Sequence, residues 1–262
     1  MVGGLRYGVG AAVLVSALCA SAVPADATAL PRVLGIDVSA YQHARGAVID
    51  WRQAARAGVR FVAIKVSEGT YYTNPYYASD ARAAIHAGLY VAPYVFANPY
   101  ASGGARQARF ALARTVYPLR GPMLPLVVDL ESDPYTRQEH VNACYGLKKR
   151  QMTGWITAFA AQTRRTSGRS PIIYTTASWW QQCTWNSAAL RRDPLWVAAY
   201  DISRPEMPAG WRSWTFWQYR KAAHVNGISY RGGADLSYAS DFFATLTGHH
   251  RHHRKHRHLR HH

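Results

Sequence analysis

The sequence predicts an α/β domain built as a (β/α)8-like, TIM-type barrel whose last units are irregular. Three observations indicate this fold. Short apolar segments of strand length alternate with segments of helical length along most of the chain. Two junctions, AGVRFVAIKV and AGLYVAPYVF, repeat one pattern, in which a glycine ends a helix and a buried strand follows. Eight segments are candidate strands, and eight parallel strands joined by helices close naturally into a barrel.

The first half of the domain reads as consecutive βα units. The expected elements are, in order, a strand at 33–37, a helix at 51–57, a strand at 59–66, an Ala-rich helix at 76–87 and a strand at 89–96. Gly58 and Gly88 end the two helices, since glycine readily adopts the left-handed conformation of a helix C-terminus.

The second half continues the alternation and then loses it. The expected elements are a helix at 103–115, a strand at 124–130, one long helix near 136–166, a strand at 171–175, a short helical region, and strands at 195–200, 213–219 and 234–236. Turn dipeptides Asn226-Gly227 and Gly232-Gly233 precede the last strand, so a loop rather than a helix is expected there.

Both ends of the chain lie outside this domain. Residues 1–27 combine Arg6, an apolar run and the A-x-A pattern at 25–27, which together are typical of a secretory signal peptide. A membrane helix is the alternative, but the apolar run is shorter than the roughly 20 residues of a stable membrane span. Residues 249–262 contain eight His, four Arg, one Lys and one Leu, and a disordered basic tail is expected. A secreted domain over 28–248 remains, and we expect it to act as a monomer.

The domain is basic even without its tail. The formal net charge is +17, and the tail contributes five of these charges. Cell-wall polymers or anionic membranes are therefore more plausible partners than nucleic acid, and a charge that only aids solubility is the alternative. For the tail we expect docking on anionic wall polymers, with metal binding by its histidines and plain disorder as alternatives. Cys144 and Cys183 are the two cysteines outside the signal segment, and in an oxidising compartment they are expected to pair; two free thiols are the alternative.

Acidic side chains gather at the predicted carboxyl ends of strands, where barrels of this type place their active sites. The stretch LPLVVDLESDPY carries Asp129 and Glu131 on one strand face, with Leu130 between them on the other. Asp37 and Asp235 end other candidate strands, and Glu68 follows Lys65. Close carboxyls push their pKa values apart, so one stays protonated near neutral pH while the other is ionised. Such a pair suits glycoside hydrolysis.

Aromatic residues at the same strand ends indicate a sugar ligand. Tyr94, Tyr174, Tyr200 and Trp217 are expected to contact it, because aromatic faces stack on the C–H faces of sugars. Gln218 is expected to bond sugar hydroxyls. Nucleic acid is the rival ligand, but a carboxylate cluster at the same rim would repel phosphate.

Other chemistries lack their motifs. The sequence contains no G-x-S-x-G nucleophile elbow, no H-E-x-x-H pair and no phosphate-binding glycine loop. The histidines within 28–248 are scattered, and two cysteines alone make a poor metal site. No cofactor and no metal are therefore expected.

Taken in order, several motifs resemble glycoside hydrolase family 25, the N,O-diacetylmuramidases or Chalaropsis-type lysozymes. The motifs are GIDVSAYQ, IDW, FVAIKVSEGT, PYVFANP, VVDLES, PIIYTT, LWVAAYD and FWQY, and the resemblance covers roughly residues 33–243. The resemblance implies a barrel that cleaves the β-1,4 bond between N-acetylmuramic acid and N-acetylglucosamine in peptidoglycan.

The resemblance also implies roles for the acidic residues. Glu131 would be the general acid/base, and Asp129 would stabilise the charge that forms on the anomeric carbon or the acetamido group. Asp37 and Asp235 would complete an acidic ring, and Glu68 would serve substrate binding or support. The segment around Asp235 departs from the family's Asp-x-Asn pattern, because Ser237 stands in place of Asn.

Two rival functions differ from a muramidase. A catalytically silent barrel that binds peptidoglycan or chitin is one, and the intact acids Asp37, Asp129 and Glu131 argue against it. A chitinase is the other, and the chain lacks the longer run of alternating Asp residues before its acid.

Overall fold

A computed structural model describes residues 33–247 of the protein. The predicted signal peptide and basic tail lie outside the described residues, so these expectations stay predictions, as does the monomeric state. None of the helices in the described part of the chain combines the length and apolar character that crossing a membrane requires.

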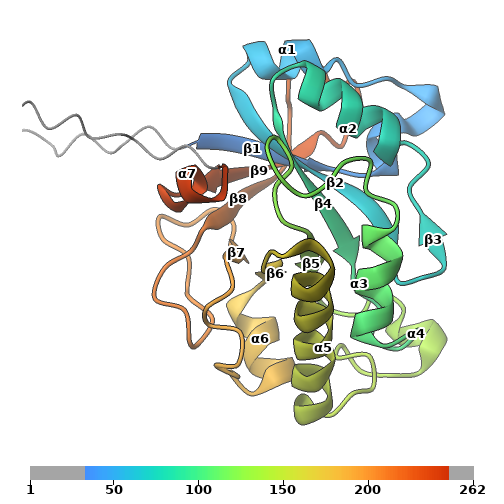
Figure 1. Cartoon of the computed structure of the whole chain (residues 1–262), viewed down its shortest axis with the longest axis vertical. Coiled ribbons are helices and arrows are strands. Elements are labelled where there is room, and N and C mark those ends of the chain that lie inside the picture. Colours follow the sequence, from blue (N-terminus) through green and yellow to red (C-terminus); the bar gives the residue numbers. More distant parts are fainter. Residues whose placement is uncertain (1–32, 248–262) are drawn as a thin grey trace, which may run out of the picture. The chain divides into compact units, whose positions relative to one another are not determined.

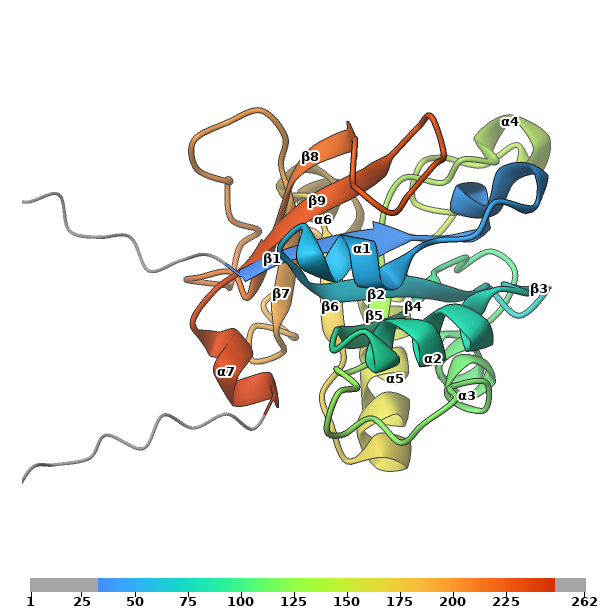
Figure 2. The same ribbon diagram turned by 90° about the horizontal axis from the view of Figure 1, so that it is seen from above.

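Eight strands form the closed barrel that the sequence predicts. In spatial order they are β1 (Val33–Val38), β9 (Ala234–Ala239), β8 (Phe216–Ala223), β7 (Leu195–Ala198), β6 (Ile172–Thr175), β5 (Val127–Asp129), β4 (Tyr90–Phe96) and β2 (Val59–Glu68), and β2 pairs with β1 to close the ring (Figures 1 and 2). The short β3 (Tyr72–Thr73) adds to β2 outside the barrel. The barrel fold and its irregular last unit are confirmed.

The last strand differs from the expectation of eight parallel strands. β9 runs antiparallel to both β8 and β1, whereas every other neighbouring pair in the barrel is parallel. The connection from β8 to β9 contains turns and no helix, and without a crossover a chain returns antiparallel to the strand it has just left.

Helices cover the outer side of the strands (Figures 1 and 2). They are α1 (Trp51–Arg56), α2 (Tyr77–His86), α3 (Gly104–Leu112), α4 (Thr136–Glu139), α5 (Lys149–Ser167) and α6 (Ala177–Thr184), with a 3₁₀ segment at Ala40–Gly46. The expectation of one long helix near 136–166 is wrong. α4 ends at His140, which is in the left-handed conformation, and a loop that carries Cys144 separates α4 from α5.

Alternation along the strands produces two apolar layers, one inside the barrel and one between strands and helices. Phe61, Trp196 and Phe216 belong to the inner layer. Phe243 of α7 (Phe242–Thr247) packs against Phe61 and Phe216, so the last described helix contributes to the barrel interior. Gly35 on β1 faces the ring of Phe61 so closely that a Cβ atom would overlap it, which explains glycine at this position.

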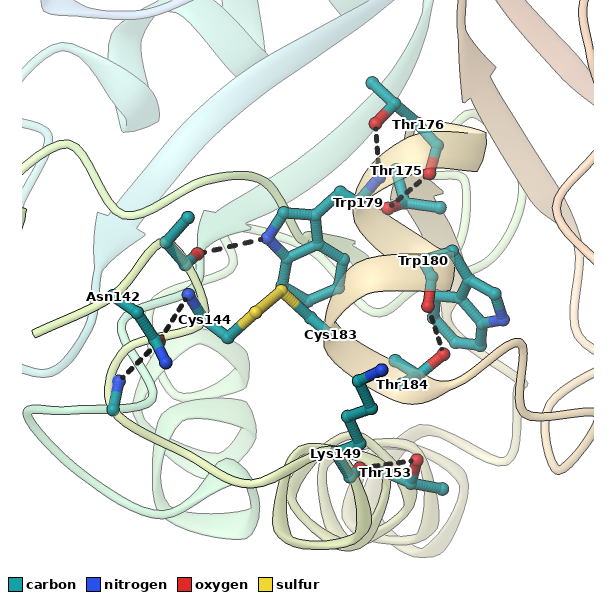
Figure 3. The surroundings of a disulfide bond; sticks show 12 residues. Asn142, Cys144, Lys149, Thr153, Thr175, Thr176, Trp179, Trp180, Cys183 and Thr184 are labelled. Atoms are coloured by element: carbon teal, nitrogen blue, oxygen red, sulfur yellow. Dashed lines mark hydrogen bonds between the residues drawn. A yellow bond between two sulfur atoms is a disulfide. The ribbon is translucent and has the colours of Figure 1, made fainter.

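A disulfide joins Cys144 to Cys183, with 5.4 Å between their Cα atoms (Figure 3). It ties the loop before α5 to the last turn of α6. The sequence separation is 39 residues, and closing a loop of this length is worth about 4 kcal/mol in the chain-entropy model.

Candidate active site

A cleft of about 270 Å³ opens at the carboxyl ends of the parallel strands. Four of the predicted acids line it, namely Asp37, Asp129, Glu131 and Asp235. They come from β1, from β5 and the residues directly after it, and from β9. The topology thus brings together carboxyl groups that lie up to about two hundred residues apart in the chain.

Asp129 and Glu131 face the cleft because the chain keeps its two-residue alternation through the end of β5. Leu130 between them is buried in the outer apolar layer. Asp129 is only 9% exposed, and its Oδ1 atom has no hydrogen-bond partner among the described residues. Two carboxyl groups in such a place cannot both ionise easily.

The pKa values of this pair show how the site holds a proton. Burial, followed by the charge of Glu131, raises the pKa of Asp129 well above its usual value. Burial also raises the pKa of Glu131, but the hydrogen bond from Asp129 and the charges of Lys221 and Lys65 act in the opposite direction. Burial and the charge of its neighbour thus favour the protonated form of Asp129.

Gln218 on β8 organises the opposite side of the cleft. The hydroxyls of Tyr174 and Tyr200 donate to Gln218 Oε1 at 2.7 and 2.6 Å, which fixes the orientation of the amide. Gln218 Nε2 then donates to Asp37 Oδ2 at 2.7 Å. Burial and the nearby Asp235 carboxylate nevertheless raise the pKa of Asp37 well above its usual value. This network holds Asp37 in one orientation.

Asp235 reaches the cleft by a route that the sequence does not predict. It lies near the start of β9 rather than at its carboxyl end, and the reversed direction of β9 brings that start to the active face. Asp235 pairs directly with Asp37 across the two strands. Its Oδ1 accepts the backbone N–H of Ala222 at 2.8 Å, which ties the carboxylate to the end of β8.

Glu68 lies beside the cleft in a cluster of hydrogen bonds. Residues three apart on a regular strand point to opposite faces, but β2 has a bulge between Lys65 and Ser67, and Lys65 Nζ lies 3.2 Å from Glu68 Oε2. The hydroxyls of Tyr71 and Tyr135 both donate to Glu68 Oε1. Burial alone would raise the pKa of Glu68, but these donors and the Lys65 charge outweigh it and lower the pKa.

The predicted aromatic contacts divide into three groups. Tyr94 and Tyr174 line the cleft. Tyr200 does not line it and acts through Gln218. Trp217 lies elsewhere, because β8 directs Phe216 into the barrel, Trp217 into the outer layer and Gln218 into the cleft. Trp217 is 4% exposed, donates its Nε1–H to the Ala199 carbonyl at 2.7 Å and does not line the cleft, so the structure does not support the expected substrate contact.

Trp196 on β7, and not Trp217, is the tryptophan that lines the cleft. Its Nε1–H donates to the buried Ser237 hydroxyl at 3.1 Å. Ser237, the departure from the family pattern, thus supports an aromatic wall of the cleft. Tyr41 and Gln42 also line the cleft and were not singled out from the sequence. Both lie two or three residues beyond Ser39 in the motif GIDVSAYQ, which was the one available signal.

The chemical capacity of the cleft follows from its lining. It presents the neighbouring carboxyls of Asp129 and Glu131 with raised pKa values, a cation at Lys65 and aromatic faces from Tyr94, Tyr174 and Trp196. Among residues 33–247, no group of three or more His, Cys, Asp or Glu side chains is arranged to hold a metal ion. The site is therefore equipped for proton transfer beside a bound sugar ring.

Comparison with known proteins identifies the same family. The profile of "Glycosyl hydrolases family 25" matches residues 36–228. The chain is 39% identical to lysozyme M1 of Streptomyces globisporus over 209 residues, which is 79% of this chain and 67% of that protein. It is 38% identical to the N,O-diacetylmuramidase of a Chalaropsis species over 201 residues, which is 74% of this chain and 91% of the relative.

Solved structures agree with these relatives. The bacterial lysozyme of Streptomyces coelicolor superposes with a TM-score of 0.75 at 34% identity, and the match covers 83% of this chain and 98% of that one. Family profile, relatives, barrel topology and the order of the sequence motifs coincide. The chain belongs to family 25 of the glycosyl hydrolases.

Proposed function

We propose that the protein is a secreted lysozyme that hydrolyses the β-1,4 bond between N-acetylmuramic acid and N-acetylglucosamine in peptidoglycan. The observation that carries this proposal is the placement of Asp129 and Glu131 together in a cleft with aromatic walls, where burial raises the pKa of both carboxyls. Family membership and the names of the relatives support the choice of substrate. The disulfide in the described domain supports secretion, because disulfides persist in oxidising compartments.

Glu131 is the proposed general acid/base, and the pair explains how it acquires its proton. A sugar chain that covers the cleft excludes water from Glu131, the more exposed of the two carboxyls. Its pKa then rises toward that of Asp129, and the proton passes across the hydrogen bond to Glu131. Glu131 protonates the leaving oxygen, while Asp129, now ionised, stabilises the positive charge that develops beside it.

The position of both carboxyls on one side of one strand segment supports an assisting role for Asp129 rather than nucleophilic attack. A nucleophile and an acid that flank a glycosidic bond stand about 5 Å apart or more. Asp129 and Glu131 instead project from one side of the same extended segment, two residues apart, rather than from opposite walls of the cleft. An acetamido group of the substrate is then the nucleophile that fits, and Asp129 orients it and carries its charge. Asp37 and Asp235 orient the sugar or the incoming water.

Glu131→Gln tests the proposal, because it retains the size of the side chain and removes its proton. We expect the wild-type protein to release reducing muramic acid ends from purified peptidoglycan, and the variant to lose at least a hundredfold in rate with unchanged folding by circular dichroism. Glu206→Gln, the same change at an exposed position, is the matched control and should retain full activity.

Each contrary result has a definite meaning. Reducing glucosamine ends in the digest would refute a muramidase. Equal rates for wild type and Glu131→Gln would refute the role of Glu131. Binding of cell walls by a wild-type protein that releases no reducing ends would support the silent binding barrel instead.

A further inference from the structure

A second hollow, which shares no lining residue with the catalytic cleft, lies between the loop before α5 and the end of α6. Its volume is about 840 Å³. Lys148, Lys149 and Arg150 at the start of α5 line one side, and Trp185, directly after α6, lines the other. Neither the sequence motifs nor the proposed catalytic mechanism uses any of these residues.

Trp185 is a large apolar residue that is exposed to solvent and has an unfavourable backbone conformation. The residue is 79% exposed, so its indole is largely open to solvent. It ends α6 in the left-handed conformation, with φ of 61°, and Asn186 after it has φ of 56°. Glycine is the usual residue at such a helix end, because a side chain is strained there. Trp185 is therefore neither buried in the core nor suited to the backbone conformation at its position. Contact with a ligand is the best explanation for a large aromatic residue in such a place.

The charges around Trp185 indicate which kind of ligand fits. The residues that line the hollow include three cations and no carboxylate. Lys148, Lys149 and Arg150 are exposed, and none of them forms an ion pair within residues 33–247. Lys149 Nζ lies 5.4 Å from the centre of the Trp185 ring. From His140 to Arg192 the chain has eight Lys and Arg residues and no Asp or Glu, so no acidic neighbour in sequence offsets this charge.

The disulfide holds the two sides of the hollow together. Cys144 precedes the basic residues by four positions, and Cys183 precedes Trp185 by two, so one covalent bond links both walls. Figure 3 shows Lys149 extending from α5 toward the end of α6 that carries Cys183 and Thr184. A site whose walls are already fixed loses less conformational entropy on binding.

We propose that this hollow is a second, non-catalytic binding site for the glycan strand of peptidoglycan. Trp185 stacks on the C–H face of a sugar ring, and the three cations pair with carboxylates of the attached peptides and of muramic acid residues that carry no peptide. The identity of this polymer rests on the proposed function. The site would hold the enzyme on an insoluble wall while the cleft cleaves a different stretch of glycan.

The test measures binding to sacculi from which phosphate-containing polymers have been stripped, using the full chain in the Glu131→Gln background so that no wall is consumed. We expect Trp185→Ala to weaken pelleting with sacculi about tenfold, which corresponds to about 1.4 kcal/mol. The double change Lys149→Ala and Arg150→Ala should weaken it by a similar factor and reduce its dependence on salt.

Two controls match these changes elsewhere on the surface. Tyr117→Ala removes an exposed aromatic residue, and the double change Arg52→Ala and Arg56→Ala removes two exposed charges from α1. Both should bind sacculi like the parent. Because Trp185 and Lys149 are exposed, thermal unfolding curves should coincide for all variants and show that lost binding is not lost folding.

The following results would overturn the inference. Binding of both hollow variants within twofold of the parent would show that the hollow is not a site. Displacement from sacculi by single-stranded DNA as readily as by soluble glycan fragments would show a general polyanion site. Trp185-dependent binding only to walls that retain phosphate polymers would assign a different ligand. Hydrolysis of a short soluble fragment by wild-type protein tests the proposed function separately.

Discussion

Asp129→Asn should change the stability of the protein and its activity in opposite directions. The substitution retains size and shape and removes the ionisable group. Asp129 is buried, and its pKa is raised well above the value near 4 that it has in an unfolded chain. Between these two pKa values the folded protein holds a proton that the unfolded chain has released. Stability therefore falls as pH rises through this range, with a slope of about 1.4 kcal/mol per pH unit for one proton.

The stability of Asp129→Asn should not fall with pH in this way. Below about pH 4 both proteins carry an uncharged group at position 129 and should be similarly stable. Two pH units higher, Asp129→Asn should exceed wild type by up to about 3 kcal/mol. Activity should move in the opposite direction, with a loss of about 10²–10³-fold in kcat, because the charge beside the developing positive centre is missing.

Urea denaturation followed by tryptophan fluorescence from pH 4 to 7 measures the stability term, and release of reducing ends measures the activity. Asp201→Asn makes the same change at an exposed carboxyl beyond β7 and should reproduce the wild-type curve. If Asp129→Asn loses stability with pH as steeply as wild type, Asp129 does not hold the proton and the account of the pair is wrong.

Two further predictions address the walls of the cleft. Gln218→Glu should lower kcat/KM at least tenfold at pH 7 and by a smaller factor at pH 5. The smaller loss is expected because Asp37, whose pKa is already raised, becomes protonated at the lower pH and can again form a hydrogen bond with residue 218. The exposed Gln181→Glu is the control, and an identical pH–rate profile for the two variants would contradict this prediction. Trp217→Phe should lower the free energy of unfolding by roughly 1–3 kcal/mol and leave KM unchanged. Trp196→Phe should raise KM severalfold. If steady-state kinetics show the reverse pattern, Trp217 and not Trp196 contacts the substrate.

Local periodicity accounts for the features that could be predicted from the sequence alone. Eight strands, the helices of the first half and the barrel class follow from apolar runs and glycine stops, which depend on neighbouring residues. The opposite orientations of Leu130 and its two acidic neighbours follow from the two-residue repeat of an extended chain. These features need no knowledge of distant contacts.

Other features were decided only when strands paired and loops closed. Which of Trp196 and Trp217 enters the cleft depends on the phase of the alternation, and pairing with neighbouring strands sets that phase. The reversal of β9, which brings Asp235 to the active face, depends on a connection without a helix. The bulge in β2 that places Lys65 beside Glu68 is likewise a property of the sheet.

The sequence by itself therefore determined the family, the barrel and the presence of a paired acid on one strand face, because each is written in short-range patterns. The tertiary structure decided how strongly each carboxyl of that pair holds a proton. Desolvation of Asp129 and the charges of Lys65, Lys221 and Asp37 act through space from other strands, and the electrostatic free energy they contribute exists only after the barrel has closed.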